Sequence, residues 1–181
     1  MVDDLVSALQ RIDDAHVTYT LNSKCLRVAL SRHDVSVQIE VKTARDLPVS
    51  LVSNRDLARQ YGLPPRLIPV VDYPVALADK MAAWNERRLV RDVYDIWFYL
   101  RMGVRPDVAS LERRLAKPAY SRLLERTEHF RGTKAESFYS FLREWVQELT
   151  GREIEAGLGD YLPPDELVGL GMRFRAELAK L

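Results

Sequence analysis

A chain of 181 residues with 47% hydrophobic and 29% charged residues can bury one substantial core and a small second lobe. The formal net charge of +1 gives no electrostatic argument for a nucleic-acid or membrane partner. The single cysteine, Cys25, excludes an intramolecular disulfide and a cysteine-based zinc site within one chain, which favours a reducing cytoplasm. No run of about 18 apolar residues occurs, so no transmembrane helix is expected.

The charges are unevenly distributed along the chain. Between Lys80 and Lys134 there are 13 Lys and Arg against 7 Asp and Glu, whereas the rest of the chain has 14 against 19. A phosphate-rich ligand would be drawn to this basic middle third. Solvated helix faces also produce such asymmetry, so the charge pattern alone selects no function.

The first part of the chain is expected to form a small mixed sheet with a flanking helix. Val35, Val37 and Ile39 alternate with polar residues, as in a half-buried strand. In chain order the patterns predict a helix over residues 3–12, strands over about 15–21, 25–30 and 35–42, a short helix near 54–61 and a strand at 67–71.

The remainder of the chain is expected to be a helical lobe. Leu77, Met81 and Trp84 form an apolar stripe at helical spacing, and Gly103 is expected to end the second helix. The predicted helices cover residues 75–88, 89–102, 106–115, about 120–130, 136–149 and 165–181, with a break from 157 to 164. The fold class is therefore α+β, with an α/β part at 1–73 and a helical lobe at 74–181.

The segment 77–100 is the densest candidate for chemistry. Lys80 lies on one predicted helix, and Asp92 and Asp95 lie three residues apart near the start of the next, on neighbouring faces. If the two helices form a hairpin, Lys80 and the aspartates meet in one cleft. The alternative is a surface ion pair between Arg91 and Asp95, with Lys80 solvated, and such a pair contributes roughly 0.3–0.5 kcal/mol.

Aromatic residues accompany this segment at helical spacing. They are expected to belong to the core, and stacking of an RNA base is a weaker alternative for Tyr94. The residues concerned are Trp84, Tyr94, Trp97 and Phe98.

The same segment resembles a family signature. A lysine on a helix that follows a β-segment, and then a helix that reads Arg-Asp-x-x-Asp-hydrophobic, is similar to the C-terminal motifs of the AbiEii/AbiGii nucleotidyltransferase toxins of type IV toxin–antitoxin systems. Here the motifs are Lys80 and Arg91 to Ile96. The strand with Glu40 resembles the family strand that carries an acidic residue. The resemblance covers about residues 3–102 in order and spacing, and is looser afterwards.

The sequence departs from the family pattern at its front. Family members begin with a Gly-Gly or Gly-Ser turn and a strand that ends in Asp-x-Asp, whereas Gly62 is the first glycine here. Asp3 and Asp4 are adjacent, so on a strand they would point to opposite faces. We therefore expect residues 1–73 to be a partial nucleotidyltransferase α/β part, whose front segment is missing or carried by a complementing chain.

The resemblance implies carboxylates that hold Mg²⁺ against the nucleotide phosphates, a lysine that neutralises triphosphate charge and an aspartate that acts as base toward an acceptor hydroxyl. By position, Lys80 is the phosphate lysine and Asp95 the base. Asp92 would orient or cap, and Arg91 would contact phosphate or lock Asp95. Glu40 is the candidate metal carboxylate, and by itself it is not expected to hold Mg²⁺ tightly.

Three functions are compatible with these observations. The first is a toxin that transfers a nucleotide from an NTP to an RNA acceptor, which is expected to be tRNA. An antitoxin would restrain this toxin, and this chain alone is expected to be inactive or nearly so. The second is a degenerate relative that binds a nucleotide or a partner without chemistry. The third is a helical DNA-binding regulator, although no helix-turn-helix pattern supports it. An exposed sheet edge would also favour a homo-oligomer.

Overall fold

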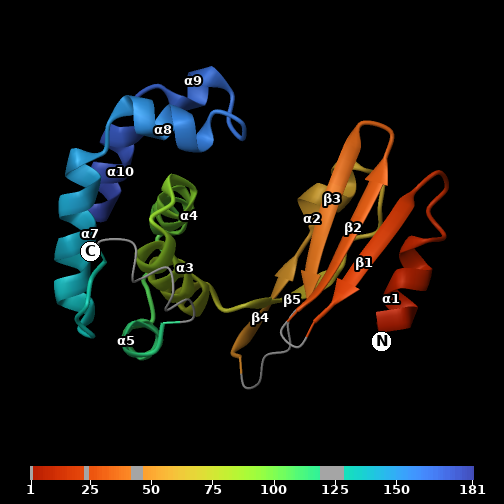
Figure 1. The fold of residues 1–181 in the computed structure, drawn as a ribbon, viewed down its shortest axis with the longest axis horizontal. Coiled ribbons are helices and arrows are strands. Elements are labelled where there is room, and N and C mark those ends of the chain that lie inside the picture. The colour runs from red at the N-terminus through yellow and green to blue at the C-terminus, as the bar shows by residue number, and fades with distance from the viewer. Residues whose placement is uncertain (1, 23–24, 42–46, 119–128) are drawn as a thin grey trace. The chain divides into compact units, whose positions relative to one another are not determined.

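The computed structural model describes residues 2–22, 25–41, 47–118 and 129–181 (Figure 1). Contacts divide the chain into two compact units, Met1–Leu47 and Pro48–Leu181. Small sheets and many helices confirm the predicted α+β class. The division groups residues 48–73 with the helices, and the predicted domain boundary after residue 73 stays a prediction.

The first unit is a helix beside a three-stranded antiparallel sheet. Its elements are α1 (Val2–Leu9), β1 (His16–Leu21), β2 (Leu26–Arg32) and β3 (Val35–Val41), with strand order β1-β2-β3. The register pairs Tyr19 with Val28 and Val28 with Ile39, so the apolar side chains of the three strands share one face. Val6 of α1 and Leu26 and Val28 of β2 are buried, where α1 lies against β1 and β2 (Figure 1).

A second, two-stranded antiparallel sheet opens the other unit. It consists of β4 (Val49–Ser53) and β5 (Leu67–Val71), with α2 (Arg55–Gln60) between them. The strand β4 was not predicted, because its side chains are mostly exposed and leave no clear alternation. The expectation of a mixed sheet was wrong for the described strands: β1, β2 and β3 follow one another through short connections, which favour antiparallel pairing.

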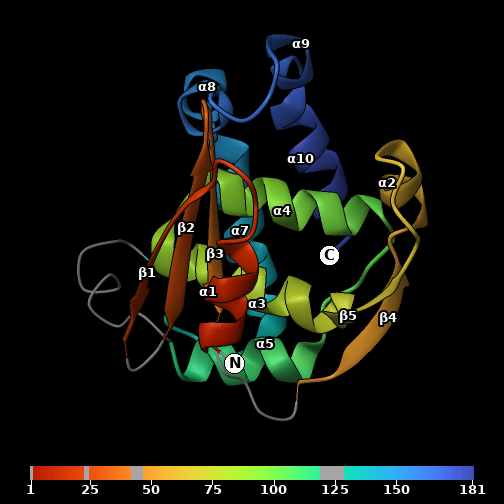
Figure 2. The ribbon, with the colours of Figure 1, turned by 90° about the vertical axis from the view of Figure 1, so that its right-hand side faces the viewer.

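The helical lobe is built around one apolar core. The helices in its described residues are α3 (Tyr73–Arg87), α4 (Val90–Arg101), α5 (Val108–Ala116), α7 (Ala135–Glu148), α8 (Gly151–Leu158), α9 (Pro164–Leu167) and α10 (Leu170–Leu178). Figure 2 shows α4 near α3 and α10, and α4 makes contacts with α3, α8 and α10. Trp84 lies at the centre, with its ring edge-on to Phe138 and Trp145 at centroid distances of 5.9 and 5.3 Å. Aromatic packing of this kind fixes the helices against one another.

Two helical predictions were wrong in detail. Helix α8 was not predicted, and the break expected from 157 begins two residues later, after Leu158; Gly157 lies in the last turn of α8, where the missing side chain lets this helix approach Val90 of α4 closely. The helix expected over 165–181 is interrupted at Gly169, whose φ of 70° is left-handed. Most of the helix predicted near 120–130 lies outside the described residues.

The start of α8 has a complete capping box. Thr150 Oγ1 accepts a hydrogen bond from the Glu153 backbone N–H at 3.3 Å, and Glu153 Oε2 accepts one from the Thr150 N–H at 2.8 Å. We expect Thr150→Ala to lower the free energy of unfolding by about 1 kcal/mol, because the Glu153 backbone N–H loses its acceptor and Glu153 Oε2 loses the hydroxyl donor. Urea denaturation measures this change. Thr150→Ser should retain most of the stability, and equal losses for both variants would contradict the capping role.

Candidate active site

The candidate site lies on the hairpin of α3 and α4. Leu77 and Met81 of α3 and Val93 and Ile96 of α4 are fully buried, so the apolar stripes hold the two helices together. The chain reverses at Arg88, which adopts a left-handed conformation with φ of 56° at the end of α3. The hairpin therefore sets the polar faces of α3 and α4 side by side.

Lys80 and Asp95 meet across this hairpin. Lys80 Nζ donates to Asp95 Oδ2 at 2.5 Å, and the two side chains are 40% and 39% exposed. This confirms the expected convergence of the lysine and the aspartate. Arg91 does not lock Asp95 in this structure: its Nη1 lies 3.4 Å from the Tyr161 hydroxyl. The alternative surface pair between Arg91 and Asp95 was therefore wrong, and phosphate contact by Arg91 stays a prediction.

The Lys80–Asp95 pair lines a small pocket of about 210 Å³, which we call the aromatic pocket. Its lining residues are Tyr73, Lys80, Asp95, Phe98, Tyr99 and Met102. Burial raises the pKa of Tyr99; Lys80 acts in the opposite direction and Asp95 in the same one. The Tyr99 phenol therefore stays protonated near neutral pH, where it can donate a hydrogen bond but cannot serve as a base.

Asp92 has a different environment from Asp95. It is only 2% exposed, and Arg87 holds both of its oxygens, with Nη2 to Oδ1 at 2.5 Å and Nε to Oδ2 at 3.2 Å. This bidentate pair joins the last turn of α3 to the first turn of α4. Asp92 therefore orients the hairpin, while a direct catalytic role for it stays a prediction.

Sequence reasoning missed Arg87. Arg87 and Asp92 are five residues apart on different helices, so no single-helix spacing rule connects them. One sequence pattern could have predicted this pair: an arginine in the last turn of one helix and an aspartate in the first turn of the next, at a predicted hairpin.

The aromatic residues of the segment divide into two groups. Trp84 and Trp97 are buried as expected, at 0% and 4% exposure, and Tyr94 packs partly buried against the core. Phe98 is 49% exposed, so its assignment to the core was wrong. It follows Trp97 by one residue, which turns it about 100° away from the buried stripe of α4.

The candidate metal carboxylate, Glu40, is hydrogen-bonded to neighbours on its own sheet. Glu40 Oε1 on β3 accepts from Arg27 Nη2 at 2.7 Å, from Arg27 Nε at 3.0 Å and from Gln38 Nε2 at 3.1 Å. Within the described ranges no group of three or more His, Cys, Asp or Glu residues could hold a metal ion. The contacts of Glu40 stabilise the polar face of the sheet, and its role as a metal ligand stays a prediction.

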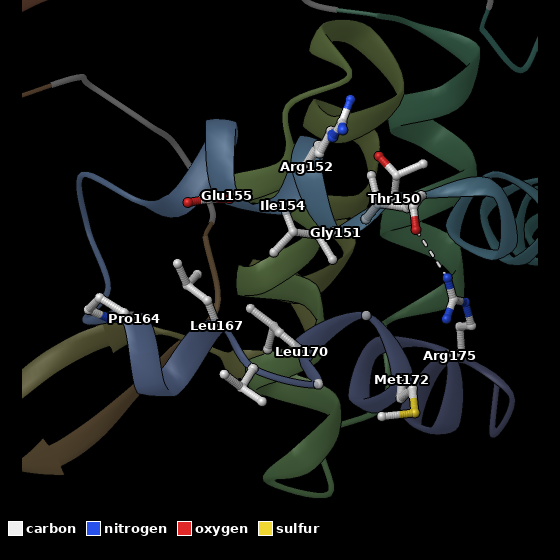
Figure 3. A pocket seen from close by; sticks show the side chains of 14 residues that line it. Thr150, Gly151, Arg152, Ile154, Glu155, Pro164, Leu167, Leu170, Met172 and Arg175 are labelled. Atoms are coloured by element: carbon white, nitrogen blue, oxygen red, sulfur yellow. Dashed lines mark hydrogen bonds between the residues drawn. The ribbon is translucent and has the colours of Figure 1, made fainter.

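A larger cavity of about 940 Å³ lies elsewhere in the helical lobe, between α8 and the α9–α10 segment (Figure 3). It shares no lining residue with the aromatic pocket. Two of its polar residues are engaged locally: Arg175 donates to the Leu149 carbonyl at 3.0 Å, as Figure 3 shows, and Thr150 belongs to the capping box. Size alone therefore does not make it the reactive site, and the Lys80–Asp95 pair is the stronger candidate.

Comparison with known families identifies the family of the chain. The family model of the AbiEii nucleotidyl transferase toxin of type IV toxin–antitoxin systems matches residues 3–168. The chain belongs to this family. The match extends well beyond residue 102, through α8, where the sequence alone gave only a loose resemblance. Neither a curated protein nor a solved structure gives a significant match.

Membership of this type IV toxin–antitoxin family suggests an antitoxin as a partner. Within the part of the chain that the structure describes, none of the helices combines the length and the apolar character needed to cross a membrane.

The buried Asp92 should make stability depend on pH. Burial raises its pKa above the ordinary 3.8, and the opposing effect of Arg87 is smaller. The folded state therefore binds the Asp92 proton more tightly than the unfolded chain does. The resulting stability is present below pH 3.8 and is lost as pH rises through the raised pKa.

We expect the free energy of unfolding of the wild type, relative to that of Asp92→Asn, to fall as pH rises through this window. Urea denaturation of both proteins at a series of pH values measures the difference, and the subtraction removes the contributions of other carboxylates. A difference that increases with pH would show that Arg87 outweighs burial.

Proposed function

We propose that this AbiEii-family toxin transfers a nucleotide from an NTP to an RNA acceptor, with tRNA as the expected acceptor. The observation that carries the proposal is the solvent-accessible contact between Lys80 and Asp95 at 2.5 Å, within the pocket of the α3–α4 hairpin. A cation and a carboxylate that are adjacent and exposed can each engage a different part of a reacting pair.

The lysine suits the phosphate end of the substrate. An ammonium group has three N–H donors, and the hydrogen bond to Asp95 uses one of them, so Lys80 can also donate to a triphosphate oxygen. Both side chains remain accessible, which keeps the ion pair weak and exchangeable. Arrival of a phosphate would therefore loosen the hold of Lys80 on Asp95.

Asp95 suits the acceptor end. Its carboxylate would accept the proton of an RNA hydroxyl as that oxygen attacks the α-phosphorus of the NTP. A new P–O bond forms, the bond to the bridging oxygen breaks, and pyrophosphate leaves with the bonding electron pair. The proton remains on Asp95 until solvent removes it. The Mg²⁺ requirement that the family resemblance implies stays a prediction.

A non-catalytic nucleotide-binding protein is the second candidate. It is favoured by one observation, namely that Arg27 and Gln38 both donate to one oxygen of Glu40, the carboxylate that the family resemblance assigns to the metal. The family match favours both nucleotide-based functions over a DNA-binding regulator.

We expect the toxin expressed from its own locus to label tRNA from at least one radiolabelled NTP in the presence of Mg²⁺. Lys80→Ala and Asp95→Ala should each reduce labelling by about 100-fold or more, since each removes a group that acts in the transition state. Gel electrophoresis of the labelled RNA measures transfer.

The matched controls are Lys180→Ala and Glu177→Ala, which remove an exposed ion pair of 2.8 Å on the last helix and its end. Both should leave labelling unchanged. Residues 1–181 are expected to label RNA slowly or not at all, because the resemblance assigns only Glu40 to the metal and one carboxylate is not expected to hold Mg²⁺ tightly. Undiminished labelling by both Lys80→Ala and Asp95→Ala would refute the proposed site.

A further inference from the structure

One face of α4 continues from Asp95 into exposed apolar surface. Asp95, Phe98, Tyr99 and Met102 occupy positions i, i+3, i+4 and i+7, so they line one side of the helix and its end. Phe98 is 49% exposed and Met102 is 51% exposed. In contrast, the adjacent Trp97 is 4% exposed, with its ring 5.9 Å from that of Phe174.

A ring from the other helix completes the aromatic pocket. Tyr73, at the start of α3, lies 5.7 Å from Tyr99 between ring centroids, with an interplanar angle of 58°. Phe98 and Tyr99 lie 6.5 Å apart at 76°. The tilted rings stand around the Lys80–Asp95 pair, so the pocket combines aromatic walls with a cation.

We propose that the aromatic pocket binds the nucleobase of the NTP by stacking, with Phe98 as the principal platform and Lys80 at the phosphate end. The inference rests on the proposed function and names the part of the site that holds the base. A ligand that satisfies both features must carry a flat aromatic group and an anionic group, which is the chemistry of a nucleotide.

The lining also determines the kind of recognition. Its polar groups are the hydroxyls of Tyr73 and Tyr99 and the Lys80–Asp95 pair. Stacking dominates over reading of the base edge in such a lining, because every base has a π-face whereas few fixed donors and acceptors are on offer. Binding should therefore discriminate only weakly among the four NTPs, and purines should bind more tightly because they overlap a ring more fully.

The test compares ATP with inorganic tripolyphosphate, which carries the charge but no base. Isothermal titration calorimetry on the 181-residue protein should show binding of both, with ATP tighter. Phe98→Ala should weaken ATP binding roughly 10-fold and leave tripolyphosphate binding unchanged, within the range for loss of one stacking partner. Phe98→Tyr should retain ATP binding, and Lys80→Ala should weaken both ligands.

The matched control is Tyr61→Ala, which removes an aromatic side chain that is 67% exposed at the end of α2. It should alter neither affinity, and circular dichroism of Phe98→Ala should match the wild type.

The outcomes separate this inference from the proposed function. Unchanged ATP affinity in Phe98→Ala, with both affinities lost in Lys80→Ala, would overturn the stacking site and leave the phosphate site standing. Weaker tripolyphosphate binding in Phe98→Ala would also overturn the stacking site. Phe98 would then act by holding the Lys80–Asp95 pair in place rather than by contact with the base. A wild-type protein that binds neither ligand, or Lys80→Ala that binds both normally, would overturn the proposed function together with the inference.

Discussion

The ion pair between Arg87 and Asp92 is the constraint on which the site depends. A carboxylate that is 2% exposed cannot remain charged without a partner, and Arg87 occupies both of its oxygens. Loss of one member of a buried pair typically costs about 3–5 kcal/mol, because the other charge is stranded. The pair therefore fixes how the end of α3 meets the start of α4, and this geometry carries Lys80 to Asp95.

The same hairpin holds a second ion pair with the opposite character. Lys80 and Asp95 are 40% and 39% exposed, so water competes for both charges and the contact contributes little to stability. A rigid buried pair and an exchangeable exposed pair thus lie one helical turn apart along α4, at Asp92 and Asp95. Because the buried pair holds the hairpin, the accessible pair can respond to a ligand without a change in the shape of the hairpin.

The sequence was sufficient where an interaction depends on local spacing. Apolar stripes predicted α3 and α4 within two residues at either end, and the motif predicted that Lys80 would face Asp95. It was insufficient where an interaction depends on packing between elements. The pairing of Arg27 with Glu40 follows from the register of β2 and β3, which the turn between them fixes. Phe98 is exposed because it lies outside the buried side of α4. The spacing of the aromatic residues alone does not show which side of the helix is buried.

The contact of Gly157 with Val90 ties the C-terminal third of the protein to the reacting helix. A methyl group at position 157 would lie 2.8 Å from the Val90 Cβ, closer than real side chains approach, so α8 or α4 would have to move. Val90 is the first residue of α4, only five positions before Asp95. Helix α8 thus supports α4, the helix that carries Asp95. Although α8 has no proposed reacting group, its position is constrained because a shift of α8 would also shift the aspartate.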